Sequence, residues 1–79
     1  MAPTVFHSGP YRYFFFSREE SRMHVHVSSS DGEAKFWLEP TIALANYKGL
    51  NSKQLNAIER EVRKKQSEIE AAWKKHLCR

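Results

Sequence analysis

The sequence is poor in the features that crosslink a small protein or carry it into a membrane. Its 79 residues include one cysteine, Cys78, so no disulfide can form within the chain, and we expect a reducing compartment. The longest strongly apolar run, residues 13–16, is far shorter than the roughly 20 residues that span a bilayer. Residues 1–3 lack the basic and apolar segments of a signal peptide. We therefore expect a cytoplasmic protein, neither secreted nor inserted in a membrane.

Glycine and proline are also scarce, at three residues each, which excludes a collagen-like chain. The hydrophobic share of 41% and the charged share of 28% are typical of globular proteins and exclude a disordered one. A chain this short buries only about 60% of the surface that its unfolded form exposes. The sequence therefore predicts a single domain over residues 1–79, which gains stability from a partner or from a second copy.

Positive charge is concentrated in the last third of the chain. Residues 1–50 contain five basic and five acidic side chains, whereas residues 51–79 contain eight basic and four acidic ones, the whole excess of +4. Pairs such as Glu59 and Arg63, four residues apart on a helix, indicate a solvated, salt-bridged face. A nucleic-acid interface is the alternative interpretation. Its candidate residues are Arg60, Arg63, Lys64 and Lys65.

The first half of the sequence has the pattern of antiparallel strands. Residues 4–8 and 11–17 flank a Gly-Pro step and are rich in aromatic and β-branched residues, which predicts a hairpin. Residues 24–28 and 33–39 alternate polar and apolar side chains around Asp31-Gly32, which predicts a second hairpin. Residues 41–47 fit neither period, so both a fifth strand and irregular chain stay open.

The second half predicts a helix over residues 52–77. Asn51 and Gln54 have the spacing of a capping box, and apolar residues recur at steps of three and four. The stripe is interrupted at Lys65 and Gln66, so a helix about 39 Å long would either overhang the sheet or break there. Together these elements predict an α+β fold with a small antiparallel sheet of four to five strands and a C-terminal helix packed on one face.

A two-residue Asp31-Gly32 turn would pair His26 with Trp37 and His24 with Glu39. Val25, Val27, Ala34, Phe36 and Leu38 then form an apolar core face. The opposite face carries the following side chains together: His24, His26, Lys35, Trp37 and Glu39.

This polar face allows three interpretations. Two imidazoles at i and i+2, with Glu39 as an oxygen ligand, could bind a metal ion, but catalytic zinc sites use three protein ligands and structural sites four. His24, His26, Lys35 and Glu39 are alternatively candidate catalytic residues of a ribonuclease, because such groups move protons and hold phosphate charge. The third interpretation is an ordinary strand surface stabilised by cross-strand pairs.

Aromatic residues outnumber what one helix can cover. Residues 11–16 are aromatic on both faces of their strand, and Trp37 adds a ring on the polar face. Such a sheet dimerises, docks another protein or curls around its own aromatics. The candidate partner-binding residues are Tyr11, Tyr13, Phe15 and Trp37.

Three segments of the sequence resemble one small bacterial family, the domain-of-unknown-function family 4160. They are residues 3–12 (PTVFHSGPYR), 24–27 (HVHV) and 32–40 (GEAKFWLEP). Members commonly have prolines before the His-x-His motif, where this chain has Arg22-Met23. The most recognisable family positions are His24, His26, Glu33, Ala34, Phe36, Trp37 and Glu39. The resemblance implies a prokaryotic, cytoplasmic protein, often encoded beside a small companion in a toxin–antitoxin-like arrangement, and it implies no reaction.

From the residues and this resemblance we predict a protein-interaction module, acting as a homodimer or with a companion protein in a toxin–antitoxin-like pair. The alternative prediction is a ribonuclease or nucleic-acid-binding component that uses His24, His26, Lys35 and Glu39. Metal binding through the two histidines is the third. We expect no cofactor and no membrane partner.

Overall fold

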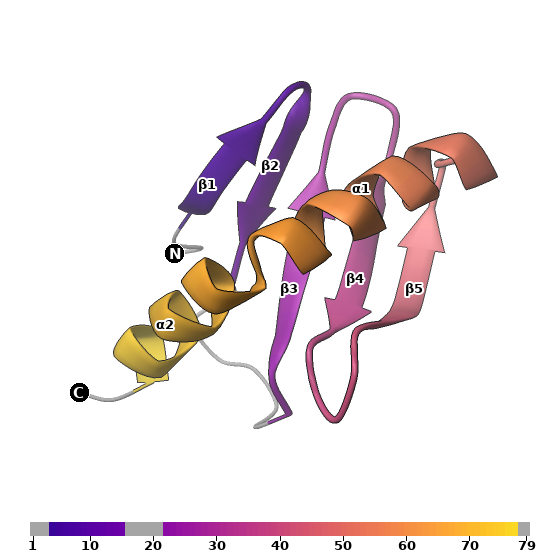
Figure 1. The fold of residues 1–79 in the computed structure, drawn as a ribbon. Coiled ribbons are helices and arrows are strands. Elements are labelled where there is room, and N and C mark those ends of the chain that lie inside the picture. The colour runs from indigo at the N-terminus through magenta and orange to yellow at the C-terminus, as the bar shows by residue number, and fades with distance from the viewer. Residues whose placement is uncertain (1–3, 16–21, 78–79) are drawn as a thin grey trace.

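The computed structural model describes residues 4–15 and 22–77, and in this part of the chain five strands precede two helices (Figure 1). The strands form one antiparallel sheet in the order β1-β2-β3-β4-β5, so each strand lies beside its neighbour in sequence. The elements are β1 Thr4–Ser8, β2 Tyr11–Phe14, β3 His24–Ser28, β4 Glu33–Trp37, β5 Ala43–Lys48, α1 Ser52–Lys64 and α2 Gln66–Leu77. The predicted α+β class is confirmed, and the open segment 41–47 contributes to the fifth strand.

Both helices lie on one side of the sheet, in front of the strands in Figure 1. The core forms between them because Ile58, Val62, Ile69 and Trp73 recur on the helices at the spacing of one apolar stripe. The sheet side of this core is completed by Tyr13, Phe15, Val25, Val27, Ala34, Phe36 and Leu38, of which Phe15 and Leu38 lie just beyond β2 and β4. We call this side of the sheet the covered face.

The hairpin of β3 and β4 has a different register from the predicted one. Ser28 pairs with Glu33, and a four-residue connection, Ser29–Gly32, replaces the two-residue turn. The Ser29 N–H donates to the Gly32 carbonyl at 2.9 Å, which closes this longer turn. The predicted pairs of His26 with Trp37 and of His24 with Glu39 are therefore wrong. Because the register shifts by two residues, each side chain keeps its predicted face.

Gly32 is required by packing rather than by the turn that the sequence suggested. A Cβ atom on Gly32 would overlap the backbone of Lys48 and Gly49, which lie at the end of β5. Gly49 itself has a φ of 79°, in the left-handed region that favours glycine. The two glycines let the β3–β4 connection approach the chain that leads from β5 into α1.

The helical half begins where the sequence predicts, and of the two alternatives left open, overhang or break, the structure has the break. Asn51 and Gln54 form both bonds of the capping box, each 2.9 Å long, so α1 starts at Ser52. One turn residue, Lys65, separates α1 from α2, at the interruption of the apolar stripe. The break lets two short helices follow the sheet instead of one overhanging helix. None of the described helices is long and apolar enough to cross a membrane.

Candidate functional site

Opposite the helices, the sheet carries the residues that alternate with the core; they are at least partly exposed, except Phe14, which is buried with 7% exposure. We call this side the open face, and its side chains are Arg12, Phe14, His26, Ser28, Glu33, Lys35, Trp37, Asn46 and Lys48. No described helix covers it, since both helices pack on the covered face. The observed register aligns His26 with Lys35, and Lys35 with Asn46, in one row across three strands.

The two histidines of β3 have different environments. His26 is half-buried on the open face, whereas His24 is 0% exposed. Their ring centroids are 5.1 Å apart and their planes are nearly perpendicular, at 87°. His24 therefore lies inside the fold and not on the exposed face where the sequence placed it.

The surroundings of His24 give it a structural role. Its Nδ1 atom is 2.6 Å from the carbonyl oxygen of Arg22, and because a carbonyl only accepts, Nδ1 carries the proton and donates it. The ring also makes edge contacts with Trp37, at a centroid distance of 5.7 Å, and with Trp73 of α2, at 4.9 Å. His24 thus joins the start of β3 to β4 and to the last helix.

Glu39 lies beyond the end of β4 and joins two chain segments. Its carboxylate accepts the Met23 N–H at 3.0 Å, and its carbonyl accepts the Nε–H of Arg22 at 2.9 Å. Among the described side chains, those of residues 4–15 and 22–75, no three His, Cys, Asp or Glu gather around a metal position. Cys78, one further candidate ligand, lies outside the described residues.

Cations and aromatic rings contact one another across the open face. Cζ of Arg22 is 4.0 Å and Nζ of Lys35 is 4.4 Å from the ring centroid of Trp37. Cζ of Arg12 is 4.5 Å from the ring centroid of Phe14. Phe14 in turn stacks on His26, with centroids 5.5 Å apart. These cation–π contacts hold positive charges at set positions on the surface.

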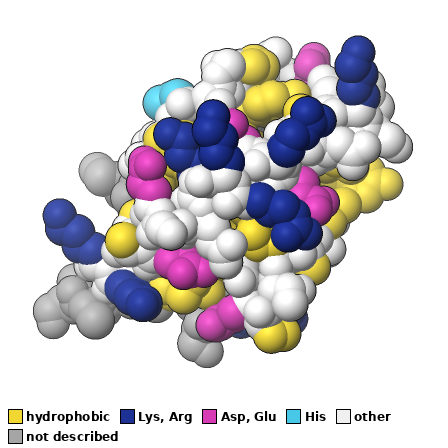
Figure 2. Space-filling model, in the orientation of Figure 1, with side chains coloured by type: hydrophobic (Ala, Val, Ile, Leu, Met, Phe, Trp, Pro, Cys, Tyr) yellow, Lys and Arg dark blue, Asp and Glu magenta, His cyan; other side chains and the backbone are white. Residues whose placement is uncertain are grey.

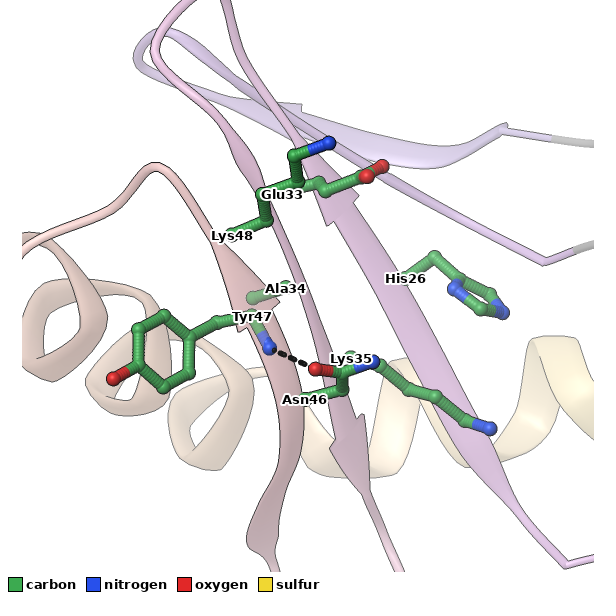
Figure 3. A pocket seen from close by; sticks show the side chains of 7 residues that line it. All are labelled: His26, Glu33, Ala34, Lys35, Asn46, Tyr47 and Lys48. Atoms are coloured by element: carbon green, nitrogen blue, oxygen red, sulfur yellow. Dashed lines mark hydrogen bonds between the residues drawn. The ribbon is translucent and has the colours of Figure 1, made fainter.

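A shallow hollow of about 420 Å³ lies beside this array. Figure 3 shows its lining residues: His26 of β3, Glu33, Ala34 and Lys35 of β4, and Asn46, Tyr47 and Lys48 of β5. The Lys35 side chain extends past Asn46 toward the side of His26, while the Tyr47 ring points away from them. The volume is at the lower end of the range of about 300–1,000 Å³ for small-ligand pockets.

The four predicted partner-binding aromatics do not share a surface. Tyr13 and Phe15 are each 1% exposed and belong to the core, and Tyr11 packs against that core while half-buried. Trp37 alone of the four lies on the open face. Tyr13 and Phe15 are buried because Phe6 stacks on Tyr13 at 4.4 Å and Trp73 meets Phe15 edge-on at 5.2 Å.

The position of Tyr13 in the core shifts the pKa of its hydroxyl. Burial raises its pKa well above the ordinary value of 10, and the negative charge of Glu61 adds to the increase. Its phenol therefore stays protonated at every physiological pH and acts as a core side chain.

The predicted basic residues of the helices lie on the opposite side of the molecule from the open face. Figure 2 shows Lys and Arg interspersed with Asp and Glu over the helices. Arg63 is paired with Glu59 at 3.0 Å, and Lys65 approaches Glu68 at 3.8 Å. Arg60 and Lys64 are exposed. The pairing agrees with the interpretation of a salt-bridged helical face.

Several open-face residues were not among the candidates from sequence. Arg12 and Phe14 alternate with Tyr13 on β2, so the alternation of side chains along this strand could have assigned both residues to the open face. Asn46 and Lys48 could not be assigned, because a bulge in β5 interrupts the alternation of that strand.

Comparison with protein-family models gives one match, to Domain of unknown function (DUF4160), over residues 11–74. The chain belongs to this family. The match covers β2–β5, α1 and most of α2, and with them the open face. No curated protein and no solved structure matches the chain. Membership in the family carries no activity with it, so function has to be argued from the surface.

Proposed function

We propose that this chain is a protein-interaction module that associates through its edge strand β5. The observation that supports this most is the exposure of two large apolar side chains there, Leu44 at 39% and Tyr47 at 53%. An edge strand presents unpaired backbone groups, and exposed apolar residues on it mark an association surface.

The bulge in β5 places both apolar residues on the same side of the strand. Tyr47 pairs with Ala34 and Leu44 with Phe36, although an odd number of positions separates them. Both side chains therefore project on the covered-face side, where they remain exposed. The outward N–H of Tyr47 donates to Oδ1 of Asn46 at 2.8 Å, which satisfies this edge group in the isolated chain.

A second copy fits this edge. Antiparallel pairing of two β5 strands, centred between Ala45 and Asn46, sets Leu44 opposite Tyr47 of the other copy. The same pairing sets Lys48 opposite Ala43, so no like charges meet across the two-fold axis. The edge hydrogen bond of Asn46 would be exchanged for hydrogen bonds between strands.

The family resemblance adds a biological setting to this proposal. We propose that the protein acts in the cytoplasm, in a toxin–antitoxin-like pair with a small companion protein, and the resemblance supports this setting without testing it. In that setting the companion competes with the second copy for the same edge, and the two assemblies exclude each other.

Light scattering across a range of concentrations, alone and with the product of the adjacent gene, tests the proposal. We expect a dimer that Leu44→Glu or Tyr47→Glu weakens at least tenfold, because each buries a charge at the pairing surface. Ala57→Glu, at an exposed position of α1, is the matched control and should leave association unchanged.

A heterocomplex sensitive to the same two substitutions, formed by a chain that alone stays monomeric at all concentrations, would keep the interaction role but overturn the choice of a second copy. A monomer at all concentrations that also fails to bind the companion would overturn the proposal.

A further inference from the structure

The open face carries more positive than negative charge and two partly exposed rings, those of His26 and Trp37. Four cations lie on or beside it, Arg12, Arg22, Lys35 and Lys48. The carboxylates of the same region are Glu33, in the hollow, and Glu39, whose oxygen already accepts the Met23 N–H. The face is thus suited to an anionic ligand, and this holds independently of what β5 binds.

We infer that the open face binds single-stranded nucleic acid. Single strands are bound by surfaces that combine cations for the phosphates with flat groups on which bases stack. Here the flat groups are the half-buried imidazole of His26 and the exposed guanidinium of Arg22, which itself lies 4.0 Å from the ring centroid of Trp37.

The dimensions favour an oligonucleotide over a lone phosphate or mononucleotide. The cations extend from β2, which carries Arg12, to β5, which carries Lys48. Four neighbouring strands about 4.8 Å apart span about 14 Å. A ligand that contacts both ends must therefore be a chain with several phosphates.

The hollow could hold one base or sugar of the bound oligonucleotide. Asn46 offers both a donor and an acceptor to a base edge, and His26 and Lys35 line the same space. An acidic peptide would use the cations, but its carboxylates offer no flat group to stack on the imidazole of His26 or the guanidinium of Arg22. For this reason the face suits a nucleic acid better than an acidic protein segment.

The same geometry argues for binding without cleavage. Acid–base cleavage of RNA needs two proton-transfer groups at the bound phosphate. The four predicted catalytic residues are His24, His26, Lys35 and Glu39. Of these, His24 is 0% exposed with its Nδ1 engaged with the Arg22 carbonyl, and the Glu39 carboxylate already accepts the Met23 N–H. His26 is left as the histidine of β3 that reaches the surface.

Fluorescence anisotropy with a labelled 12-nucleotide single strand of RNA, and with the DNA strand of the same sequence, tests the inference. We expect binding at low salt, with Lys48→Glu and Lys35→Glu each weakening it at least tenfold. Loss of one phosphate contact should also reduce the slope of log K against log salt by about 0.7. Lys64→Glu, the same charge change at an exposed position of α1, should weaken binding less than threefold.

A preference for RNA over DNA, or the reverse, identifies the natural source of the strand, and both results support the inference. Three results overturn it: no binding of either strand at low salt, equal weakening by Lys64→Glu and Lys48→Glu, or displacement of the strand by polyglutamate at equal charge. Equally tight binding of duplex would contradict recognition of single strands. Lys48 is exposed but lies opposite Glu33, so Lys48→Gln, which adds no like charge beside Glu33, is the folding control. This variant should unfold at the same urea concentration as the wild type and still bind more weakly, which separates lost binding from lost folding.

Discussion

The two faces of the sheet are built by alternate residues of the same strands, yet the side chains of one face pack in the core and those of the other contact one another at the surface. On the covered face, Val25 and Val27 are 0% and 1% exposed and contact the helices. On the open face, Lys35 and Trp37 are half-buried and contact one another. The comparison shows that a period of two separates residues that stabilise the fold from residues available for recognition.

His24 is the exception that marks the limit of this rule. The alternation of side chains along β3 assigns His24 to the open face. However, α2 reaches the end of the strand and buries His24 against Trp73. The alternation along a strand therefore predicts the direction of a side chain, whereas contact with the helices determines its exposure.

The largest expected effect comes from the covered face. Ile58→Ala removes a side chain that is 0% exposed, and we expect a loss of about 2–5 kcal/mol in the free energy of unfolding. Lys35→Ala on the open face should cost less than about 1 kcal/mol. Urea denaturation of both variants measures the contrast, and equal losses would contradict the division between the faces.

The two histidines sharpen the comparison within one strand. His24→Ala leaves a cavity beside Trp73 and removes the donor to the Arg22 carbonyl, so we expect a loss of about 2–3 kcal/mol. His26→Ala should cost less than about 1 kcal/mol, because its ring is half-buried. If His26→Ala proved the more destabilising in the same denaturation experiment, the assignment of His24 to the fold would be wrong.

Alkaline pH tests the environment of Tyr13. The pKa of Tyr13 in the folded state lies above the unfolded value of about 10. The contribution of Tyr13 to the free energy of unfolding is therefore complete below about pH 10 and declines as the pH rises above that value. Comparing the wild type with Tyr13→Phe isolates this group from other tyrosines and lysines. We expect the stability advantage of the wild type to fall between about pH 10 and 11. An advantage that stays constant over this range would contradict the burial of the phenol.

The smallest effect is expected on the outer surface of the helices. Arg63→Ala removes the bond to Glu59, an exposed pair four residues apart, and should cost about 0.3–0.5 kcal/mol. Thermal unfolding in low and high salt checks this, since salt should reduce the difference. A loss above about 1 kcal/mol would mean that this face is more than a solvated surface.

Much of the fold was predictable because its signals are local. Alternation assigned the faces of β3 and β4 correctly even though the register shifted by two residues. The capping box at Asn51 and the interruption at Lys65 gave the start and the break of the helices. The turn was mispredicted because Gly32 is needed for its approach to Gly49, a contact between distant segments.

The candidate site was less predictable because its geometry depends on tertiary contacts. The burial of His24 requires Trp73 from the last helix, and the burial of Phe15 requires the same residue. The strand character of β5 was hidden by the bulge at Ala45, which breaks the period of two. Lys35 and Trp37, in contrast, lie where alternation put them.

The most direct test of the difference between the faces uses the two tryptophans, one on each side of the sheet. Trp37 lies half-buried on the open face, whereas Trp73 belongs to α2 and is 4% exposed in the core. Their indole N–H signals can be followed by NMR while a single-stranded oligonucleotide is added. We expect the Trp37 signal to shift and the Trp73 signal to stay in place. A shift of Trp73 alone, equal shifts of both signals, or no shift at saturating oligonucleotide would contradict the assignment of the open face as the ligand surface.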